Sequence, residues 1–172
     1  MTIRCAIVGA TGIAGQQFLA ALANHPFIKI VRLAASERSA GKKYKDAITT
    51  PTGGIGWYVD GALPDVYATM VVEDAMKMSL DGLDVIFSAV ETDAARTLET
   101  HYATRVPVVS TASAYRYEDD VPIIIPAVNG GHASLIDEQR SRRGETDPKP
   151  PAPRAREDVH SVVSELHLQP GL

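Results

Sequence analysis

The sequence predicts an α/β protein built on a doubly wound, mostly parallel sheet. Short apolar runs alternate with stretches of helical periodicity along most of the chain. Three glycines at three-residue spacing join the first apolar run to the first helical stretch, as in nucleotide-binding βαβ units. The length of 172 residues suits one domain with a sizeable core. Together these features indicate a Rossmann-like sheet.

The apolar runs place the strands in order. Residues 3–8 form the first expected strand, and 15–24 a helix with Phe18, Leu19 and Leu22 on one face. The second strand spans 27–35. Prolines and glycines predict loops over the next forty residues, with a strand at 66–72 and a short helix at 74–80.

The second half of the chain continues the alternation. Residues 83–90 are continuously apolar, as a buried parallel strand should be, and 92–104 are helical. Residues 106–111 and 121–128 are the fourth and fifth expected strands. Right-handed crossovers should bring the ends of the first and third strands together. A nucleotide would lie at that point.

Composition changes after the first 143 residues. The segment 144–172 holds five of the eleven prolines and little core-forming periodicity. Such a segment buries too little apolar surface to offset its ordering entropy, so we expect a mostly disordered tail. The first 143 residues are the folded domain.

Charge and cysteine content exclude several classes of protein. The net charge of −4 and the pI of about 5.7 give no reason to expect nucleic acid or an anionic membrane as partner. No apolar stretch approaches the roughly 18 residues of a transmembrane helix, and the N-terminus lacks a signal-peptide pattern. A single cysteine excludes a disulfide framework within these residues. We expect a cytoplasmic protein.

The glycine turn predicts a phosphate-binding loop. Gly9 would permit the tight turn, Gly12 would let the backbone approach a pyrophosphate, and Gly15 would let helix and strand pack closely. Thr11 adds a hydroxyl donor. The alternative is a crowded strand-to-helix turn that needs small residues only for packing.

The end of the second expected strand favours NADP over NAD. NAD sites usually carry a carboxylate there, about 20 residues past the glycines. This chain instead offers Ser36, Arg38 and Ser39, two hydroxyls and a guanidinium suited to a 2′-phosphate. Glu37 could serve as the carboxylate, which keeps NAD open. We expect it to point to solvent because it lies one step beyond the strand.

Several stretches resemble one family. "GATGIAGQQF", "RSAGKKY", "DVIFSAV", "VPVVSTASAYRYEDD" and "DVPIIIPAVN" occur in the order and spacing of the archaeal and fungal branch of aspartate-semialdehyde dehydrogenase. The resemblance covers residues 3–143. It implies a Rossmann-like NADP-binding domain followed by a catalytic and dimerisation domain in a homo-oligomer. The implied reaction is the reversible NADP-dependent reduction of aspartyl phosphate to aspartate semialdehyde, through a cysteine thiolate and a histidine.

The resemblance also assigns residues. It implies that the pyrophosphate is lined by Thr11, Gly12, Ile13 and Ala14. It implies that the 2′-phosphate is held by Ser36, Arg38 and Ser39, with Ser88 and Ala89 beside the cofactor. Arg116 corresponds to the arginine that helps to hold the phosphate of the substrate.

The sequence departs from the family in its catalytic segment. Thr111 stands where the family usually has asparagine, and Ala127 where it has glutamate. The N-C-[ST] motif of the catalytic cysteine does not occur, and Cys5 lies in the first expected strand, where cysteine behaves as a small buried hydrophobe. The five histidines have no metal-site spacing. We therefore assign no catalytic residue and no metal ligand, and expect the NADP-binding half without the catalytic domain, inactive alone.

Three alternatives stay open. The chain could be a non-catalytic NADP-binding module, such as a sensor or partner subunit. It could resemble archaeal malonyl-CoA reductase, which shares the architecture. It could be an atypical short-chain reductase, a group that also uses G-x-x-G-x-x-G. The typical form needs Tyr-x-x-x-Lys, and none of the six tyrosines has lysine four residues on.

Overall fold

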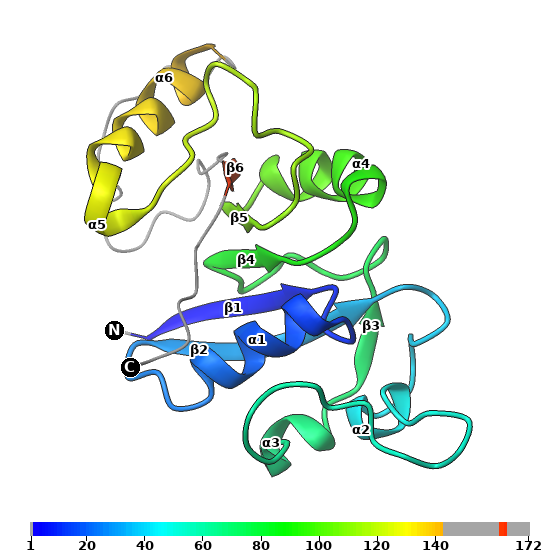
Figure 1. Cartoon of the computed structure of the whole chain (residues 1–172). Helices are drawn as coiled ribbons and strands as arrows, with labels where there is room; N and C mark the ends of the chain where they lie inside the picture. Colours follow the sequence, from blue (N-terminus) through cyan, green and yellow to red (C-terminus); the bar gives the residue numbers. More distant parts are fainter. Residues whose placement is uncertain (1, 143–161, 165–172) are drawn as a thin grey trace.

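A six-stranded parallel sheet forms the centre of the computed structural model, which describes residues 2–142 and 162–164 (Figure 1). Its strands are β1 (Ile3–Val8), β2 (Ile28–Ala35), β3 (Val72–Asp74), β4 (Val85–Ser88), β5 (Val108–Ser110) and β6 (Val162–Ser164). Every pairing is parallel, in the order β3-β2-β1-β4-β5-β6. This order confirms the predicted doubly wound, Rossmann-like fold.

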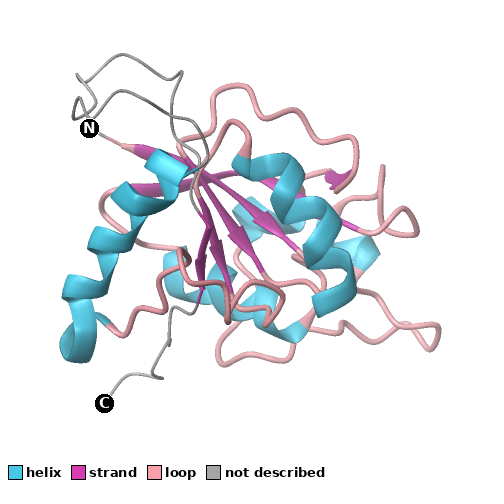
Figure 2. Ribbon diagram, turned by 90° about the horizontal axis from the view of Figure 1, so that it is seen from above, coloured by secondary structure: helices cyan, strands magenta, loops and turns pink. Residues whose placement is uncertain are grey.

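Two long helices cover opposite faces of the sheet, visible from above in Figure 2. Ile7 packs in the cluster that contains Phe18 of α1 (Ile13–Leu22). Its neighbour Val8 packs in the other cluster, with Leu98 of α4 (Thr92–Ala103). Side chains alternate across a strand, so β1, β2, β4 and β5 each supply both cores. None of the helices in the described residues is long and apolar enough to span a bilayer.

The remaining helices are short. They are α2 (Tyr44–Ala47), α3 (Asp65–Ala68), α5 (Pro126–Asn129), the 3-10 helix η1 (Gly130–Ser134) and α6 (Leu135–Arg142). The first two lie in the connection between β2 and β3, and the last three follow β5.

The strand order reverses at β1, which creates the crevice that the fold offers to a ligand. β1 pairs with β2 on one side and with β4 on the other, and Val8 is in register with both Ala34 and Ser88. The carboxyl ends of these three strands are therefore level. The predicted adjacency of the first and third sequence-derived strands, β1 and β4, is confirmed.

The prediction of a strand over 121–128 is wrong. The chain runs irregularly to Ile125 and then forms α5. Pro122 and Pro126 cannot donate to a sheet ladder, and Pro126 occupies the first turn of the helix, where its missing N–H costs nothing. Asn129 holds the bend, because its Oδ1 accepts the Ile125 N–H at 2.6 Å.

The expected strand at 66–72 and helix at 74–80 are also corrected. Residues 65–68 form α3 after Pro64 at the N-cap, β3 begins only at Val72, and turns follow it. Asp74 stabilises the turn that stands in place of the expected helix. Its Oδ1 accepts the Met76 N–H at 2.9 Å, a local side-chain bond that competes with helix formation.

The expected tail at 144–172 falls almost entirely outside the described residues. Val162–Ser164 are the exception, because they form β6 and pair in parallel with β5. The proline content of the segment does not predict this strand.

The glycine turn between β1 and α1 is packed backbone against backbone. Gly9 has φ +78°, and a Cβ there would lie 2.3 Å from the carbonyl oxygen of Ala89. A Cβ on Gly15 would lie 2.2 Å from the carbonyl oxygen of Gly9. These approaches press α1 and the end of β4 against the turn. Packing alone therefore requires glycine at both positions.

We predict that Gly15→Ala destabilises the fold. The added methyl group meets rigid backbone rather than a movable side chain, so the free energy of unfolding should fall by about 1–3 kcal/mol or more. Urea denaturation checks this. Gly131→Ala is the matched control, because a Cβ there meets nothing within 4 Å. Equal stability of the two variants would contradict the packing argument.

A buried carboxyl ties β4 to β5 from beneath. Glu99 of α4 is 1% exposed, and its Oε1 accepts hydroxyl bonds from Ser88 and Ser110, each at 2.6 Å. Its Oε2 has no hydrogen-bond partner among the described residues. Burial raises the pKa of Glu99, although the bonds from Ser110 and Ser88 oppose this. The fold therefore favours the neutral acid more than the unfolded chain does.

We predict that Glu99 makes stability fall as pH rises. Because its folded pKa is raised, its stabilising contribution is complete below the ordinary value of 4.5 and is lost as pH rises through the folded pKa. Glu99→Gln resembles the neutral acid, so at low pH its unfolding free energy should lie within about 1 kcal/mol of the parent. At neutral pH the variant should gain relative to the parent. Thermal melts from pH 4.5 to 8 measure the difference, and a constant difference would refute the prediction.

Candidate functional site

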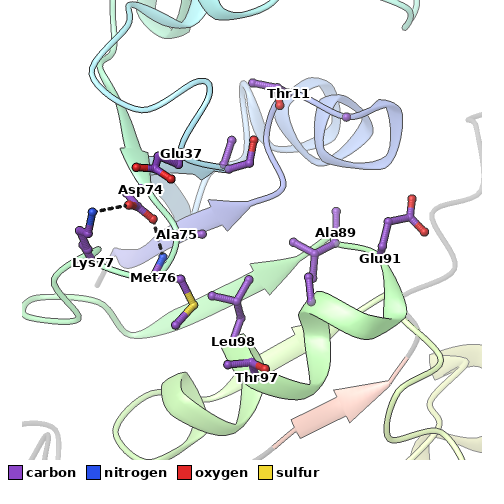
Figure 3. Close-up of a pocket in the computed structure, with 15 residues that line it drawn as sticks. Thr11, Glu37, Asp74, Ala75, Met76, Lys77, Ala89, Glu91, Thr97 and Leu98 are labelled. Carbon is purple, nitrogen blue, oxygen red and sulfur yellow. Dashed lines mark hydrogen bonds and ion pairs between the residues drawn. The ribbon is translucent and has the colours of Figure 1, made fainter.

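A cavity of about 750 Å³ opens at the carboxyl ends of the strands, at the crevice beside β1 (Figure 3). Its walls come from residues 11–12 of the glycine turn, 35–37 after β2, 74–77 after β3 and 89–91 after β4. One face of α4 closes it, through Ala94, Thr97 and Leu98. Parallel α/β sheets place their ligands in this position.

Backbone and side-chain hydrogen bonds hold the glycine turn in place. The N–H groups of Gly9 and Ala10 both donate to the Ala34 carbonyl of β2, at 2.9 and 3.1 Å. The Tyr44 hydroxyl of α2, buried, donates to the Ala10 carbonyl at 2.8 Å. The turn is therefore fixed from β2 and α2 before any ligand binds.

Gln16 fastens the next part of the turn to a distant loop. Its side chain is fully buried, and its amide nitrogen donates to the Gly56 carbonyl at 2.7 Å and to Thr11 at 3.3 Å. Its Oε1 accepts the Tyr58 N–H at 2.7 Å. A buried amide with all of these bonds made adds rigidity to the wall that contains Thr11.

The first turn of α1 supplies backbone hydrogen-bond donors and no charged side chain. Gly12 is the N-cap residue, no side chain caps the helix, and no acidic residue lies in its first turn. The first N–H groups of a helix lack intrahelical partners, and the helix dipole adds partial positive charge there. Gly12 lines the cavity, so this wall suits an anion such as a diphosphate.

The sequence-predicted residues divide into lining and supporting groups. Thr11, Gly12, Ser36 and Ala89 line the cavity. Ser88 does not, because its buried hydroxyl donates into the core to Glu99.

The other predicted residues of the glycine turn do not line the cavity. Gly9 and Gly15 pack behind the turn, and Ile13 and Ala14 are exposed at the start of α1. Gly9 and Gly15 therefore shape the wall without forming its surface.

The predicted arginines lie outside the cavity lining. Arg38 and Ser39 belong to the turn that follows β2, where the Ser39 N–H donates to the Ser36 carbonyl at 2.9 Å. This bond brings Ser39 close to a lining residue. Arg116 is half-buried in the turn after β5, where its backbone N–H donates to the Ser113 carbonyl at 3.2 Å.

Glu37 matches the expectation only in part. It is exposed, as expected, but it also lines the cavity beside Asp74 and Lys77 (Figure 3). The Lys77 Nζ lies 3.1 Å from Asp74 Oδ2. The Met76 N–H and Lys77 lower the pKa of Asp74, while Asp74 and then Glu37 raise the pKa of Lys77. Asp74 and Lys77 are therefore charged at neutral pH.

Sequence reasoning missed the walls formed by residues 74–77 and α4. Ala94, Thr97 and Leu98 share one helix face, and their spacing of three and four residues could have marked it. Residues 74–77 carry no such pattern, and they were expected in a helix instead of a cavity wall.

Cys5 cannot act as a nucleophile at neutral pH. It is fully buried in β1, and burial raises the pKa of its thiol to about 12. Within the described part of the chain, no group of three or more His, Cys, Asp or Glu side chains is placed to hold a metal ion. The described residues that line the cavity thus supply hydrogen-bond donors and charged groups, and Cys5 is not among them.

Curated relatives are similar over most of this chain. Aspartate-semialdehyde dehydrogenase of Methanothermobacter thermautotrophicus is 39% identical over 142 residues, which are 83% of this chain and 39% of the relative. Malonyl CoA reductase (NADP) of Metallosphaera sedula is 37% identical over 143 residues, 83% of this chain and 38% of the relative. The chain thus spans about two fifths of the length of these relatives.

A solved structure shares the fold. Aspartate semialdehyde dehydrogenase of Candida albicans, crystallised with NADP, superposes with a TM-score of 0.76 at 31% identity. The superposition covers 95% of this chain and 42% of that one. Residues 4–136 match the family described as "Semialdehyde dehydrogenase, NAD binding domain". This match spans most of the chain, so the protein belongs to the semialdehyde dehydrogenase family and carries its NAD-binding domain.

Proposed function

We propose that this chain binds NADP(H) in the cavity and supplies the cofactor-binding part of a semialdehyde dehydrogenase. One observation carries the proposal: the cavity lies at the carboxyl ends of β1 and β4 with the glycine turn as its wall. The NADP-bound structure of the Candida albicans enzyme supports the choice of cofactor.

The residues present fit a dinucleotide. A Cβ on Gly12 would meet nothing closer than 3.5 Å, so this glycine is not required by packing and leaves backbone open to a ligand. Thr11, Gly12 and the first turn of α1, with Ile13 and Ala14, would hold the diphosphate. Ser36, Arg38 and Ser39 would receive the 2′-phosphate, which keeps the sequence-based assignment. Bound NADPH supplies a hydride.

The substrate of the whole enzyme is proposed from its relatives. We infer reduction of aspartyl phosphate to aspartate semialdehyde, because the Methanothermobacter relative is named for that product. Malonyl-CoA reduction is the second candidate, because the Metallosphaera relative is similar over the same part of the chain. Arg116 is proposed to hold the phosphate of the first substrate. Cys5 has no part in either reaction, since its thiol is buried and protonated.

The first test is titration of the purified chain with NADPH, followed by ligand fluorescence. We expect saturable binding, and Gly12→Ala should weaken it by roughly tenfold, about 1.4 kcal/mol, because a methyl group would hold the diphosphate away from the backbone. The melting temperature of the variant should stay close to that of the parent, because the methyl group meets only ordinary contacts.

Gly131→Ala is the matched control and should bind NADPH like the parent. Absence of NADPH and NADH binding by the folded parent would refute the proposed function. Unchanged NADPH binding by Gly12→Ala would show that the diphosphate does not lie against this wall.

A second test concerns Arg38. Replacing it with glutamine should weaken NADPH binding by roughly tenfold and leave NADH binding unchanged, because only NADPH carries the 2′-phosphate. Parallel titrations with the two cofactors measure the ratio. Equal losses for both would show that Arg38 supports the loop rather than the phosphate.

A further inference from the structure

We propose that Lys77 is a second cation for the 2′-phosphate, inside the cavity, and that Asp74 pairs with it until the phosphate binds. This inference rests on the proposed function and names a specificity residue that the sequence reasoning did not assign. Lys77 is the cationic side chain among the residues that line the cavity, whereas Arg38 belongs to the turn outside that lining.

The end of β3 places Lys77 next to the site expected for the 2′-phosphate. Asp74 is in register with Ala35, the last residue of β2, and Ser36 follows Ala35 into the cavity wall. The turn after β3 then brings Lys77 back toward that wall, because its N–H donates to the Asp74 carbonyl at 3.0 Å. Figure 3 shows Lys77, Asp74 and Glu37 together on this side of the cavity.

Asp74 serves the turn and the lysine with different oxygens. Oδ1 accepts the Met76 N–H at 2.9 Å, which fixes the turn, and Oδ2 lies 3.1 Å from Lys77 Nζ. The Asp74 side chain is only 16% exposed, whereas that of Lys77 is 76% exposed. The carboxylate is therefore the fixed partner, and the ammonium can move to another anion at small cost.

Charge balance makes this lysine necessary for the 2′-phosphate. The charged lining residues are Glu37, Asp74, Glu91 and Lys77, three carboxylates and one ammonium. Glu37 and Asp74 lie on the side where the phosphate would enter and repel it (Figure 3). Without Lys77 the cavity lining on this side would carry only negative charge and would suit the ribose hydroxyls of NADH instead.

Two substitutions should therefore shift cofactor preference in opposite directions. Lys77→Met removes the cation and should weaken NADPH binding by roughly tenfold while NADH binding is kept. Asp74→Asn keeps an oxygen for the Met76 N–H, frees Lys77 and removes one repulsive charge. It should strengthen NADPH binding severalfold relative to NADH. A residue that only supported the turn would not give opposite signs.

The experiment uses the full chain and isothermal titration with NADPH and NADH, repeated with 2′,5′-ADP and 5′-AMP as probes of the adenosine end. Lys29→Met is the control, because it removes the same charge at the amino end of β2, away from the cavity. The 2′-phosphate contribution is the affinity ratio within each pair of ligands. We expect this ratio to fall in Lys77→Met, to rise in Asp74→Asn and to be unchanged in Lys29→Met.

The outcomes separate the two proposals. If the parent binds NADPH and NADH but Lys77→Met leaves their ratio unchanged, this inference is overturned and the proposed function stands. If Asp74→Asn lowers the ratio of NADPH to NADH affinity or leaves it unchanged, the claim that Asp74 competes with the 2′-phosphate for Lys77 is overturned. If the folded parent binds none of the four ligands, both proposals fail.

Discussion

Direct backbone contact between the glycine turn and its neighbours is the constraint on which the site depends. Gly9 lies against the carbonyl of Ala89, and Gly15 against the carbonyl of Gly9, at distances that exclude a Cβ. These contacts join β1, β4 and α1 within one small volume. Because Gly9, Gly12 and Gly15 carry no side chains, the start of α1 lies close to the crevice. This packing leaves the backbone of Gly12 open in the cavity wall.

Buried polar side chains support the glycine turn and the strand ends, whereas the charged side chains lie at the exposed edge of the cavity. Gln16 and Tyr44 hold the turn from the core, and Glu99 ties the ends of β4 and β5 together beneath the cavity. Each makes a long-range bond that anchors a carbonyl or hydroxyl in a place that water does not reach. Unpaired polar groups there would cost free energy, so these bonds make the site rigid. The charged residues at the cavity edge can therefore be substituted without breaking these buried hydrogen bonds.

Periodicity predicted the central fold because the buried strands and long helices are strongly patterned. Val8 and Phe18 belong to such patterns, and the βαβ rule then placed β1 beside β4. The segment around Pro126 was apolar enough to look like a strand, but its prolines cannot pair in a sheet. The wall at Asp74 was missed for a different reason: residues 75–77 form a turn, held by a side-chain bond from Asp74 to the Met76 N–H, where a helix was expected. A short turn of that kind leaves no periodic signal in a sequence.

The two helices that begin at the cavity differ in how their dipoles are used. Both α1 and α4 follow neighbouring strands at the point of reversal, so the partial positive charge of each N-terminus lies at the cavity. The N-cap residue of α4 is Glu91 and its first turn contains Asp93, so carboxylates of the chain already compensate that end. The first turn of α1 has no acidic residue. A diphosphate would therefore be attracted to the α1 wall and repelled by Glu91 on the opposite wall. In the proposed binding mode, this asymmetry would orient the dinucleotide, with its adenosine end on the side formed by β2 and β3.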